Sequence, residues 1–173
     1  WLLCDKFLDR MVLQYSHLSP NLYCACVWPK ADCKQKREET LKLITNTGKI
    51  VYTKEVNFSY CGLTNFMIQI YSNQKWIGTY KDSHKGVKGK VDECYKKNRT
   101  TLIIFFEAKT LNEVLELKKN IRDIFGIGNH SIHISDTGFE TGEMAELLLN
   151  FNSLMHLNYG SPDKYSEATR ELL

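Results

Sequence analysis

The sequence lacks several features that would place it in a specialised class of protein. Its 173 residues contain no apolar run that approaches about 18 residues, so we expect no transmembrane helix. The apolar first residues have neither a basic leader nor a small-residue cleavage site, which argues against a signal peptide. The formal net charge of +3 is too small to indicate nucleic acid binding. We therefore predict that neither nucleic acid nor a membrane is a partner.

Cysteine pairs with the CxxC spacing are also absent, although the chain has six cysteines. Cys24 and Cys26 share one face of an expected strand with Leu22 and Trp28. This placement indicates small core residues rather than disulfides or metal ligands. Because free cysteines are typical of a reduced compartment, we predict a cytoplasmic protein.

The chain has no internal repeat, linker or low-complexity segment, and helical patterns alternate with short apolar strands. Strands are predicted at 22–28, 49–58, 102–106 and 131–135, and the third is continuously apolar, as in a central strand covered on both faces. This order predicts a single layered α/β domain over 1–173, with about four strands and helices packed on the sheet. Periodicity leaves the strand order open, and it does not distinguish a parallel sheet from a mixed one. Because the chain starts without Met and ends in EATRELL, the domain can be the N-terminal part of a longer protein.

Helices are expected over 2–15, from Asp32 to Gly48, over 63–77, around 87–95, from Thr110 to Gly126 or Gly128, and at the end of the chain. The first carries an apolar helical stripe of Leu8, Met11, Val12 and Tyr15, and the third is expected to bury one face made of Leu63, Phe66, Met67, Ile70 and Ile77. Three helix starts have capping-box spacing: Asp32 with Gln35, Thr110 with Glu113 and Thr137 with Glu140. The last helix is expected to bury one apolar face, made of Met144, Leu147, Leu148, Phe151 and Met155.

The most informative segment is Asn129–Asn158, NHSIHISDTGFETGEMAELLLNFNSLMHLN. Alternation along the strand places His133 on the face opposite to Ile132 and Ile134. His130 has the parity of the isoleucines, so both rings can reach one metal ion only if His130 lies in the preceding loop. We therefore predict no metal site, and we expect His133 either to face a substrate or to be a hydrogen-bonded structural histidine.

An acidic run follows this strand, formed by Asp136, Glu140, Glu143 and Glu146. Carboxylates in a first helical turn offset the helix dipole, which is a sufficient role for Glu143 and Glu146. Asp136 directly follows the strand, where a carboxylate can hold Mg²⁺ beside a phosphate or act as a base. Together with Glu140 it could form a carboxylate pair at one metal ion.

A pair of asparagines in the last helix is a further candidate. Asn150 and Asn152 flank Phe151, where asparagine amides either end the helix or face a partner.

The basic segment KDSHKGVKGKVDECYKKNR, residues 81–99, places Lys85, Lys88 and Lys90 among glycines, ahead of an expected helix. A phosphate could dock on backbone N–H groups and lysines there, although the spacing is not that of a Walker A motif and a solvated basic loop is the alternative. Trp76 and Tyr80 could supply a stacking surface for a base or sugar, and a core position is equally compatible with Trp76.

The segments WIGTYKDSHKGVKGK and ELKKNIRDIFGIG, together with the histidine block, resemble the N-terminal module of bacterial and large-virus nucleotidyltransferase-like proteins. The resemblance covers about residues 20–160. In those proteins the module precedes a nucleotidyltransferase-like domain, sometimes near surface-polysaccharide genes. This chain departs from the pattern after Asp136, because Gly138 and Phe139 stand where the family has two acidic residues. It also lacks the Gly-Ser turn and any DxD pair, so the resemblance implies an accessory domain whose transfer chemistry lies in a downstream domain.

We therefore predict a domain that binds a nucleotide, nucleotide-sugar or other phosphorylated small molecule in a nucleotidyl or glycosyl transfer system. Its expected catalytic residues are His133, Asp136 and Glu140. The expected substrate- or phosphate-binding residues are Trp76, Lys85, Lys88, Lys90, His130, Asn150 and Asn152. No cofactor is assigned, and Mg²⁺ is the candidate. The alternatives are a freestanding Mg²⁺-dependent transferase and a non-catalytic protein-interaction module. The leading prediction requires the lysine segment to fold over the tip of the histidine strand and to form one polar pocket with it.

Overall fold

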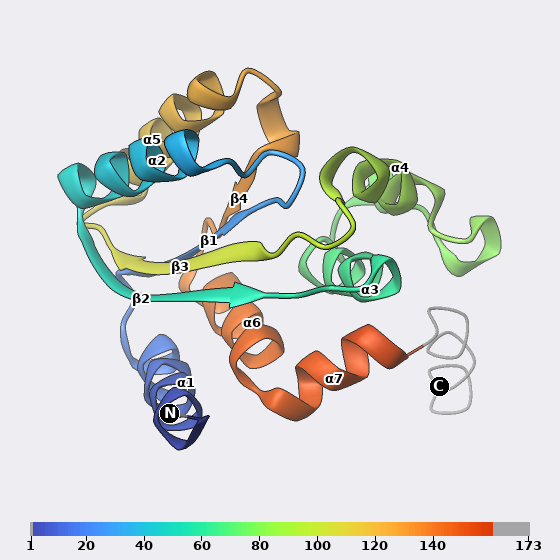
Figure 1. The fold of residues 1–173 in the computed structure, drawn as a ribbon, viewed down its shortest axis with the longest axis horizontal. Helices are drawn as coiled ribbons and strands as arrows, with labels where there is room; N and C mark the ends of the chain where they lie inside the picture. Colours follow the sequence, from blue (N-terminus) through green and yellow to red (C-terminus); the bar gives the residue numbers. More distant parts are fainter. Residues whose placement is uncertain (1, 161–173) are drawn as a thin grey trace.

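The computed structural model describes residues 2–160 as an α/β domain with a four-stranded open sheet (Figure 1). The strands are β1 (Leu22–Val27), β2 (Lys49–Val56), β3 (Thr101–Glu107) and β4 (Ile132–Ile134), in the order β2-β3-β1-β4. Each neighbouring pair is antiparallel. The predicted fold class and the approximate number of strands are thus confirmed. The antiparallel pairing is new information, because hydrophobic periodicity carries no information on strand direction.

The central strand β3 is buried on both faces, as its continuous apolar sequence predicted. Ile103 and Phe105 belong to the core on one face of the sheet, and Ile104 and Phe106 belong to the core on the other. Strand residues alternate between faces, so each apolar strand residue contributes to one of two separate hydrophobic layers. The result is a sheet sandwiched between two layers of helices.

The two helical layers differ in size (Figure 1). One face of the sheet is covered by α2 (Lys34–Thr47) and α5 (Leu111–Phe125). The opposite face packs against α1 (Leu2–Leu18), α3 (Tyr60–Ile70), α4 (Lys85–Cys94), α6 (Gly138–Leu149) and α7 (Phe151–Tyr159). Short 3₁₀ turns are η1 (Lys75–Ile77), η2 (Tyr80–Asp82) and η3 (Gly128–His130). None of the helices within 2–160 combines the length and the apolar character that a membrane span requires.

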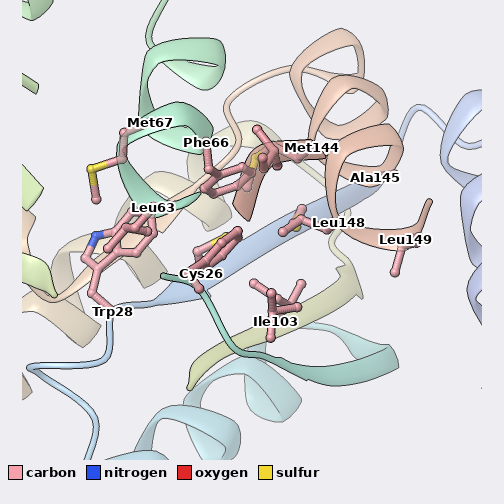
Figure 2. Packing of buried hydrophobic residues seen from close by; sticks show 14 of the residues in the cluster. Cys26, Trp28, Leu63, Phe66, Met67, Ile103, Met144, Ala145, Leu148 and Leu149 are labelled. Carbon is pink, nitrogen blue, oxygen red and sulfur yellow. The ribbon is translucent and has the colours of Figure 1, made fainter. Parts of the chain in front are cut away.

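The larger core layer is built around aromatic side chains of α3 and the sheet (Figure 2). Phe66 is fully buried, stacks on Phe58 at 5.3 Å between ring centroids and meets Trp28 edge-on at 6.5 Å. Cys24 and Cys26 are buried free thiols in the same layer. Their predicted role as small core residues is confirmed.

Helix boundaries follow the local capping signals in some places and not in others. Thr110 caps α5 through the predicted capping box with Glu113, and the helix ends at Gly126, whose φ is 69°. The predicted box at Asp32 is wrong. Its carboxylate instead binds the guanidinium of Arg37, and α2 starts after Cys33 without a side-chain cap. The carboxylate binds the guanidinium with both oxygens, and such a bidentate charge-assisted pair is stronger than a single bond to a backbone N–H.

Three predicted apolar faces were also partly wrong. The helix predicted over 63–77 ends at Ile70, and Ile77 lies in η1. The last helix is broken at Asn150 into α6 and α7, which leaves Phe151 and Met155 60% and 41% exposed. The apolar stripe of α1 buries only Val12 among its predicted members, while Leu8, Met11 and Tyr15 are exposed. In each case the helical periodicity of the sequence continues, while the helix itself ends, is broken, or leaves its apolar side chains exposed.

Candidate functional site

A polar cleft of about 450 Å³ opens between the two helical layers, beside β4. Its volume is in the range of about 300–1,000 Å³ that is typical of small-molecule sites. It is lined by the segment from the end of α3 through η1, by α4, α5, η3 and β4, and by the turn after β4 with the start of α6. The lining residues are Ile70, Tyr71, Ser72, Asn73, Gln74, Trp76, Lys90, Lys118, Arg122, Asn129, His133, Asp136, Thr137, Phe139, Glu140 and Glu143. We refer to this site as the polar cleft.

The structure brings five of the residues singled out in the sequence into the polar cleft. Lys90 comes from the basic segment, and Trp76 comes from the turn before it. The histidine block contributes His133, Asp136 and Glu140. The required meeting of the lysine segment and the histidine strand therefore exists, although only one of the three lysines takes part.

Lys85 and Lys88 do not line the polar cleft. They were expected in a glycine-rich loop ahead of a helix, and this expectation is wrong because α4 already begins at Lys85. A helix presents its side chains in different directions, so only the member at the buried face, Lys90, reaches the site. Gly86 is closely packed, because an added Cβ would lie 1.8 Å from the carbonyl oxygen of Trp76.

The remaining candidates lie outside the polar cleft. His130 is in η3, and its carbonyl oxygen accepts a hydrogen bond from the Cys94 thiol at 3.7 Å. Asn150 caps α7, since its side-chain oxygen accepts from the Asn152 N–H at 3.0 Å. Of the two readings of these amides, the helix-ending one describes Asn150.

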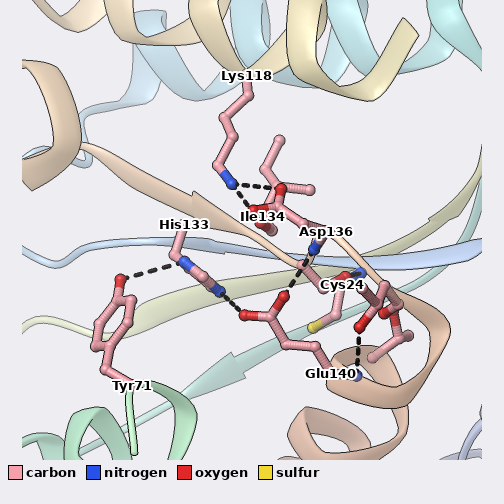
Figure 3. Close-up of polar contacts among 10 residues, drawn as sticks. Cys24, Tyr71, Lys118, His133, Ile134, Asp136 and Glu140 are labelled. Carbon is pink, nitrogen blue, oxygen red and sulfur yellow. Dashed lines mark hydrogen bonds and ion pairs between the residues drawn. The ribbon is translucent and has the colours of Figure 1, made fainter. Parts of the chain in front are cut away.

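A chain of hydrogen bonds crosses the polar cleft (Figure 3). Tyr71 Oη lies 3.1 Å from His133 Nδ1, and His133 Nε2 lies 2.9 Å from Glu140 Oε1. The second oxygen of Glu140 accepts from the backbone N–H of Asp136 at 2.7 Å. Because an ionised carboxylate only accepts, Nε2 of His133 holds the ring hydrogen and Nδ1 accepts from the Tyr71 hydroxyl. In this series of hydrogen bonds each donor therefore faces an acceptor.

The fold positions both His133 and Glu140. His133 pairs with Cys26 across β4 and β1, and its face is opposite to that of Ile132 and Ile134, as strand parity predicted. Thr137 caps α6 by accepting from the Glu140 N–H at 3.1 Å, which places Glu140 in the first turn, close to the strand. Strand parity and helix capping together thus point the imidazole and the carboxylate at each other.

Burial sets the protonation states in the chain. Burial lowers the pKa of His133 below its ordinary value, only partly offset by the hydrogen bond to Glu140. Burial alone would raise the pKa of Glu140, but the bonds from His133 and from the Asp136 N–H outweigh it and lower that pKa. Burial also raises the pKa of Tyr71. At neutral pH Tyr71 is therefore a phenol, His133 a neutral imidazole and Glu140 a carboxylate.

Lys118 ties the end of β4 to α5. Its ammonium donates to the Ile134 carbonyl at 2.7 Å and to Asp136 Oδ1 at 2.8 Å. Asp136, considered above as a possible base or metal ligand, is therefore held in an ion pair. Within 2–160, no group of three or more His, Cys, Asp or Glu side chains is placed to hold a metal ion.

Lys90 and Arg122 are the two cations of the polar cleft that have no carboxylate partner among the described residues. Lys90 Nζ donates to the Asn129 carbonyl at 2.9 Å and lies 5.4 Å from the Tyr71 ring centroid and 5.9 Å from that of Trp76. Arg122 Nε is buried without a hydrogen-bond partner in residues 2–160. Burial lowers the pKa of Lys90, and the nearby charge of Arg122 lowers it further. Two neighbouring cations without a counter-charge form a site that favours an anion.

Sequence reasoning missed Tyr71, Lys118 and Arg122. Lys118 and Arg122 are four residues apart on α5, so they lie on one side of that helix. They stand next to the apolar positions Leu117 and Ile121 in the sequence. Lysine and arginine at such positions are usually solvated, so the sequence gave no reason to single them out. Tyr71 follows the last residue of α3 and was not distinguished from the other aromatics.

The buried imidazole predicts a loss of stability in mild acid. As the pH falls, His133 of the unfolded chain takes up a proton near its ordinary pKa of 6.5, while the folded ring, with its lowered pKa, does not. The contribution to stability is complete above pH 6.5 and is lost as the pH falls through the folded pKa of His133. Glu140 adds a further loss below 4.5, its ordinary pKa. Urea unfolding midpoints measured from pH 7 to pH 5 should therefore decrease.

His133→Gln provides the control for this prediction. Its amide can still donate to Glu140 but does not titrate, so the variant should show a smaller decrease of the midpoint between pH 7 and pH 5 than the original protein. Equal decreases in both proteins would mean that His133 does not determine the acid sensitivity.

The chain matches no protein-family model, and no curated protein matches it significantly. The resemblance to the N-terminal module of nucleotidyltransferase-like proteins accordingly stays a prediction.

Proposed function

We propose that the polar cleft binds a nucleotide, nucleotide-sugar or other phosphorylated small molecule, and that the protein serves a nucleotidyl or glycosyl transfer system. The observation that carries the proposal is the pair Lys90 and Arg122, two neighbouring cations in a cleft, without a carboxylate partner among residues 2–160. A phosphate group supplies the missing negative charge and the acceptor atoms that the guanidinium lacks.

The distribution of charge in the polar cleft supports a ligand with two different ends. Helices α4 and α5 contribute the cations Lys90, Lys118 and Arg122, whereas the segment after β4 contributes the acids Asp136, Glu140 and Glu143. A nucleotide or nucleotide-sugar has phosphates for the first group and hydroxyl or amino donors for the second. Inorganic polyphosphate has no such donors and is the poorer fit.

The aromatic side of the polar cleft supports the same ligand class. Trp76 is 44% exposed, and its ring packs against Tyr71 at 5.1 Å between centroids. An indole that is held on one side and open on another offers a surface on which a base or sugar can stack. Trp76 belongs to neither hydrophobic core layer.

The resemblance supports assigning this ligand to a transfer system, in which a downstream nucleotidyltransferase-like domain would perform the transfer. Under this proposal the present chain recognises or delivers the phosphorylated molecule. Mg²⁺ would then arrive as the metal complex of the ligand, and the ion pair between Asp136 and Lys118 would remain intact.

The proposal predicts a ligand-dependent gain in melting temperature that depends on Arg122. In a screen of nucleoside triphosphates, nucleotide-sugars and sugar phosphates, a ligand at about a hundred times its Kd stabilises the protein by about 2.7 kcal/mol. Arg122→Met and Lys90→Met should each weaken binding by about tenfold or more, because a hydrogen bond to a charged group contributes about 1.5–3 kcal/mol. Isothermal titration would measure the change in Kd.

Lys85→Met and Lys88→Met are the matched controls, since both remove a lysine from α4 outside the polar cleft. They should bind the ligand with the original affinity. If these two variants lose binding while Arg122→Met retains it, the ligand lies on the outer face of α4 and the proposed site is wrong.

A second function, that of a protein-interaction module, is favoured by exposed apolar side chains on the layer opposite to α2 and α5. They are Phe7, Leu18, Phe139, Phe151 and Tyr159, each at least 60% exposed. Large apolar side chains left in contact with solvent can be covered by a protein partner. The ligand screen separates the two proposals, because an interaction module predicts no melting shift with any nucleotide or sugar phosphate.

A further inference from the structure

The hydrogen-bonded chain of Tyr71, His133 and Glu140 is more than phosphate binding requires. A hydroxyl, an imidazole and a carboxylate follow one another at 3.1 Å and 2.9 Å, and all three residues line the polar cleft (Figure 3). The three come from the end of α3, from β4 and from the first turn of α6. Both ring nitrogens of His133 are thus satisfied, and their two partners are a hydroxyl and a carboxylate that face the same cleft.

This arrangement has the geometry of an activated nucleophile. In such sites a hydroxyl lies within hydrogen-bond distance of a base, and a third group orients the base and stabilises its charged form. Here His133 Nδ1 accepts from the Tyr71 hydroxyl, and Glu140 holds the opposite ring nitrogen as a donor. The backbone N–H of Asp136 fixes the second oxygen of Glu140, so the carboxylate cannot turn away from the ring.

We propose that Tyr71 Oη attacks the α-phosphorus of a nucleoside triphosphate bound in the polar cleft and forms a nucleotidyl-tyrosine. The proposal rests on the proposed function, because the triphosphate must first bind beside Lys90 and Arg122. It goes beyond binding, since the chain itself would accept the nucleotidyl group before any partner domain acts.

A bond forms between Tyr71 Oη and the α-phosphorus, and the bond between that phosphorus and the bridging oxygen of the β-phosphate breaks. Magnesium pyrophosphate leaves with the electron pair of the broken bond. The phenolic proton passes to His133 Nδ1, and the resulting imidazolium is stabilised by Glu140 until the proton is released to solvent.

The surroundings suit this reaction. Burial raises the pKa of Tyr71, so the phenol needs a base in direct contact, and His133 Nδ1 is the atom in that place. Burial weakens His133 as a base, and the hydrogen bond to Glu140 opposes that effect. Lys90 lies over the Tyr71 ring, and Arg122 is close enough to affect the charge of Lys90. These two cations can stabilise the negative charge that builds up on the leaving pyrophosphate.

The experiment is incubation of the protein with each of ATP, GTP, CTP and UTP in the presence of MgCl₂, followed by intact-mass measurement and peptide mapping. We expect a mass gain of one nucleoside monophosphate, located on Tyr71. Tyr71→Phe should abolish the gain, because it removes the attacking oxygen and keeps the aromatic ring. His133→Gln should slow the labelling by about 100-fold or more, as expected for loss of a general base.

Tyr159→Phe is the matched control, because Tyr159 is 81% exposed and lies outside the polar cleft. Unspecific labelling would favour such an accessible tyrosine, so this variant should label as fast as the original protein. A gain on another residue, or a gain of a single phosphoryl group, would overturn the proposal.

The failure of this step and the failure of the proposed function give different results. If a nucleoside triphosphate raises the melting temperature and no mass gain follows, Tyr71 is not an acceptor, and the binding function stands. If no triphosphate produces either a shift or a mass gain, this proposal fails, and nucleotide-sugars and sugar phosphates decide whether the binding function survives.

Discussion

Gly86→Ala should destabilise the protein by about 1–3 kcal/mol, the usual effect of overpacking, and should weaken ligand binding as well. The added Cβ would lie 1.8 Å from the carbonyl oxygen and 2.9 Å from the carbonyl carbon of Trp76. Backbone atoms cannot rotate away as a side chain can, so α4 must move away from η1. Trp76 and Lys90 lie on the two sides of this contact and would separate. Urea unfolding and ligand titration would measure the two effects.

Gly89→Ala is the matched control on the same helix, because an added Cβ at Gly89 meets no atom within 4 Å. Alanine is the better helix former, so this variant should gain about 0.5–1 kcal/mol of stability and keep its affinity. Equal destabilisation by both substitutions would mean that the loss arises from helix α4 itself and not from its contact with Trp76.

This pair of glycines also shows where sequence reasoning stops. Both glycines stand among the same lysines, and the sequence suggested one role for both, an anion-binding loop. Periodicity places residues on a face of an element but does not state which other element approaches that face. The contact of Gly86 with Trp76 depends on the packing of α4 against η1 and could not be predicted from local sequence.

The parts of the site that were predictable depend on local rules. Strand parity placed His133 opposite to Ile132 and Ile134, and capping spacing placed Glu140 in the first turn of α6, so their proximity could be anticipated within seven positions of sequence. Tyr71 is 62 positions away from its partner His133. Lys118 reaches Asp136 only because α5 packs beside β4. Contacts of this second kind follow from strand order and helix placement, which the sequence pattern leaves open.

The same limit applies to the core. Ile103 and Phe105 could be assigned to a central strand because an uninterrupted apolar run has no polar face to expose. Phe151 was assigned to a buried face because the helical spacing continued through Asn150. The side chain of Asn150 instead accepts from the N–H groups of the next turn and begins a new helix. A capping residue inside an apolar pattern can therefore change which face is buried.

Phe66→Ala should cause the largest loss of stability among these substitutions, about 3–5 kcal/mol. Phe66 is fully buried, stacks on Phe58 and meets Trp28 edge-on, so its removal leaves a cavity that surrounding aromatic rings cannot fill (Figure 2). Because a natural domain is stable by only about 5–15 kcal/mol, this loss would shift the unfolding midpoint strongly. Urea denaturation followed by tryptophan fluorescence would measure it.

Phe151→Ala tests the same substitution at a phenylalanine that helical spacing also assigned to a buried face. Phe151 is 60% exposed and lies on α7, with Lys6 Nζ 5.4 Å from its ring centroid. Its truncation removes little buried area, so the expected change is within about 0.5 kcal/mol. A loss comparable to that of Phe66→Ala would require Phe151 to be covered in solution, for example by a protein partner or a second copy of the chain. The comparison therefore decides between the helical periodicity, which buries both rings, and the break at Asn150, which exposes one of them.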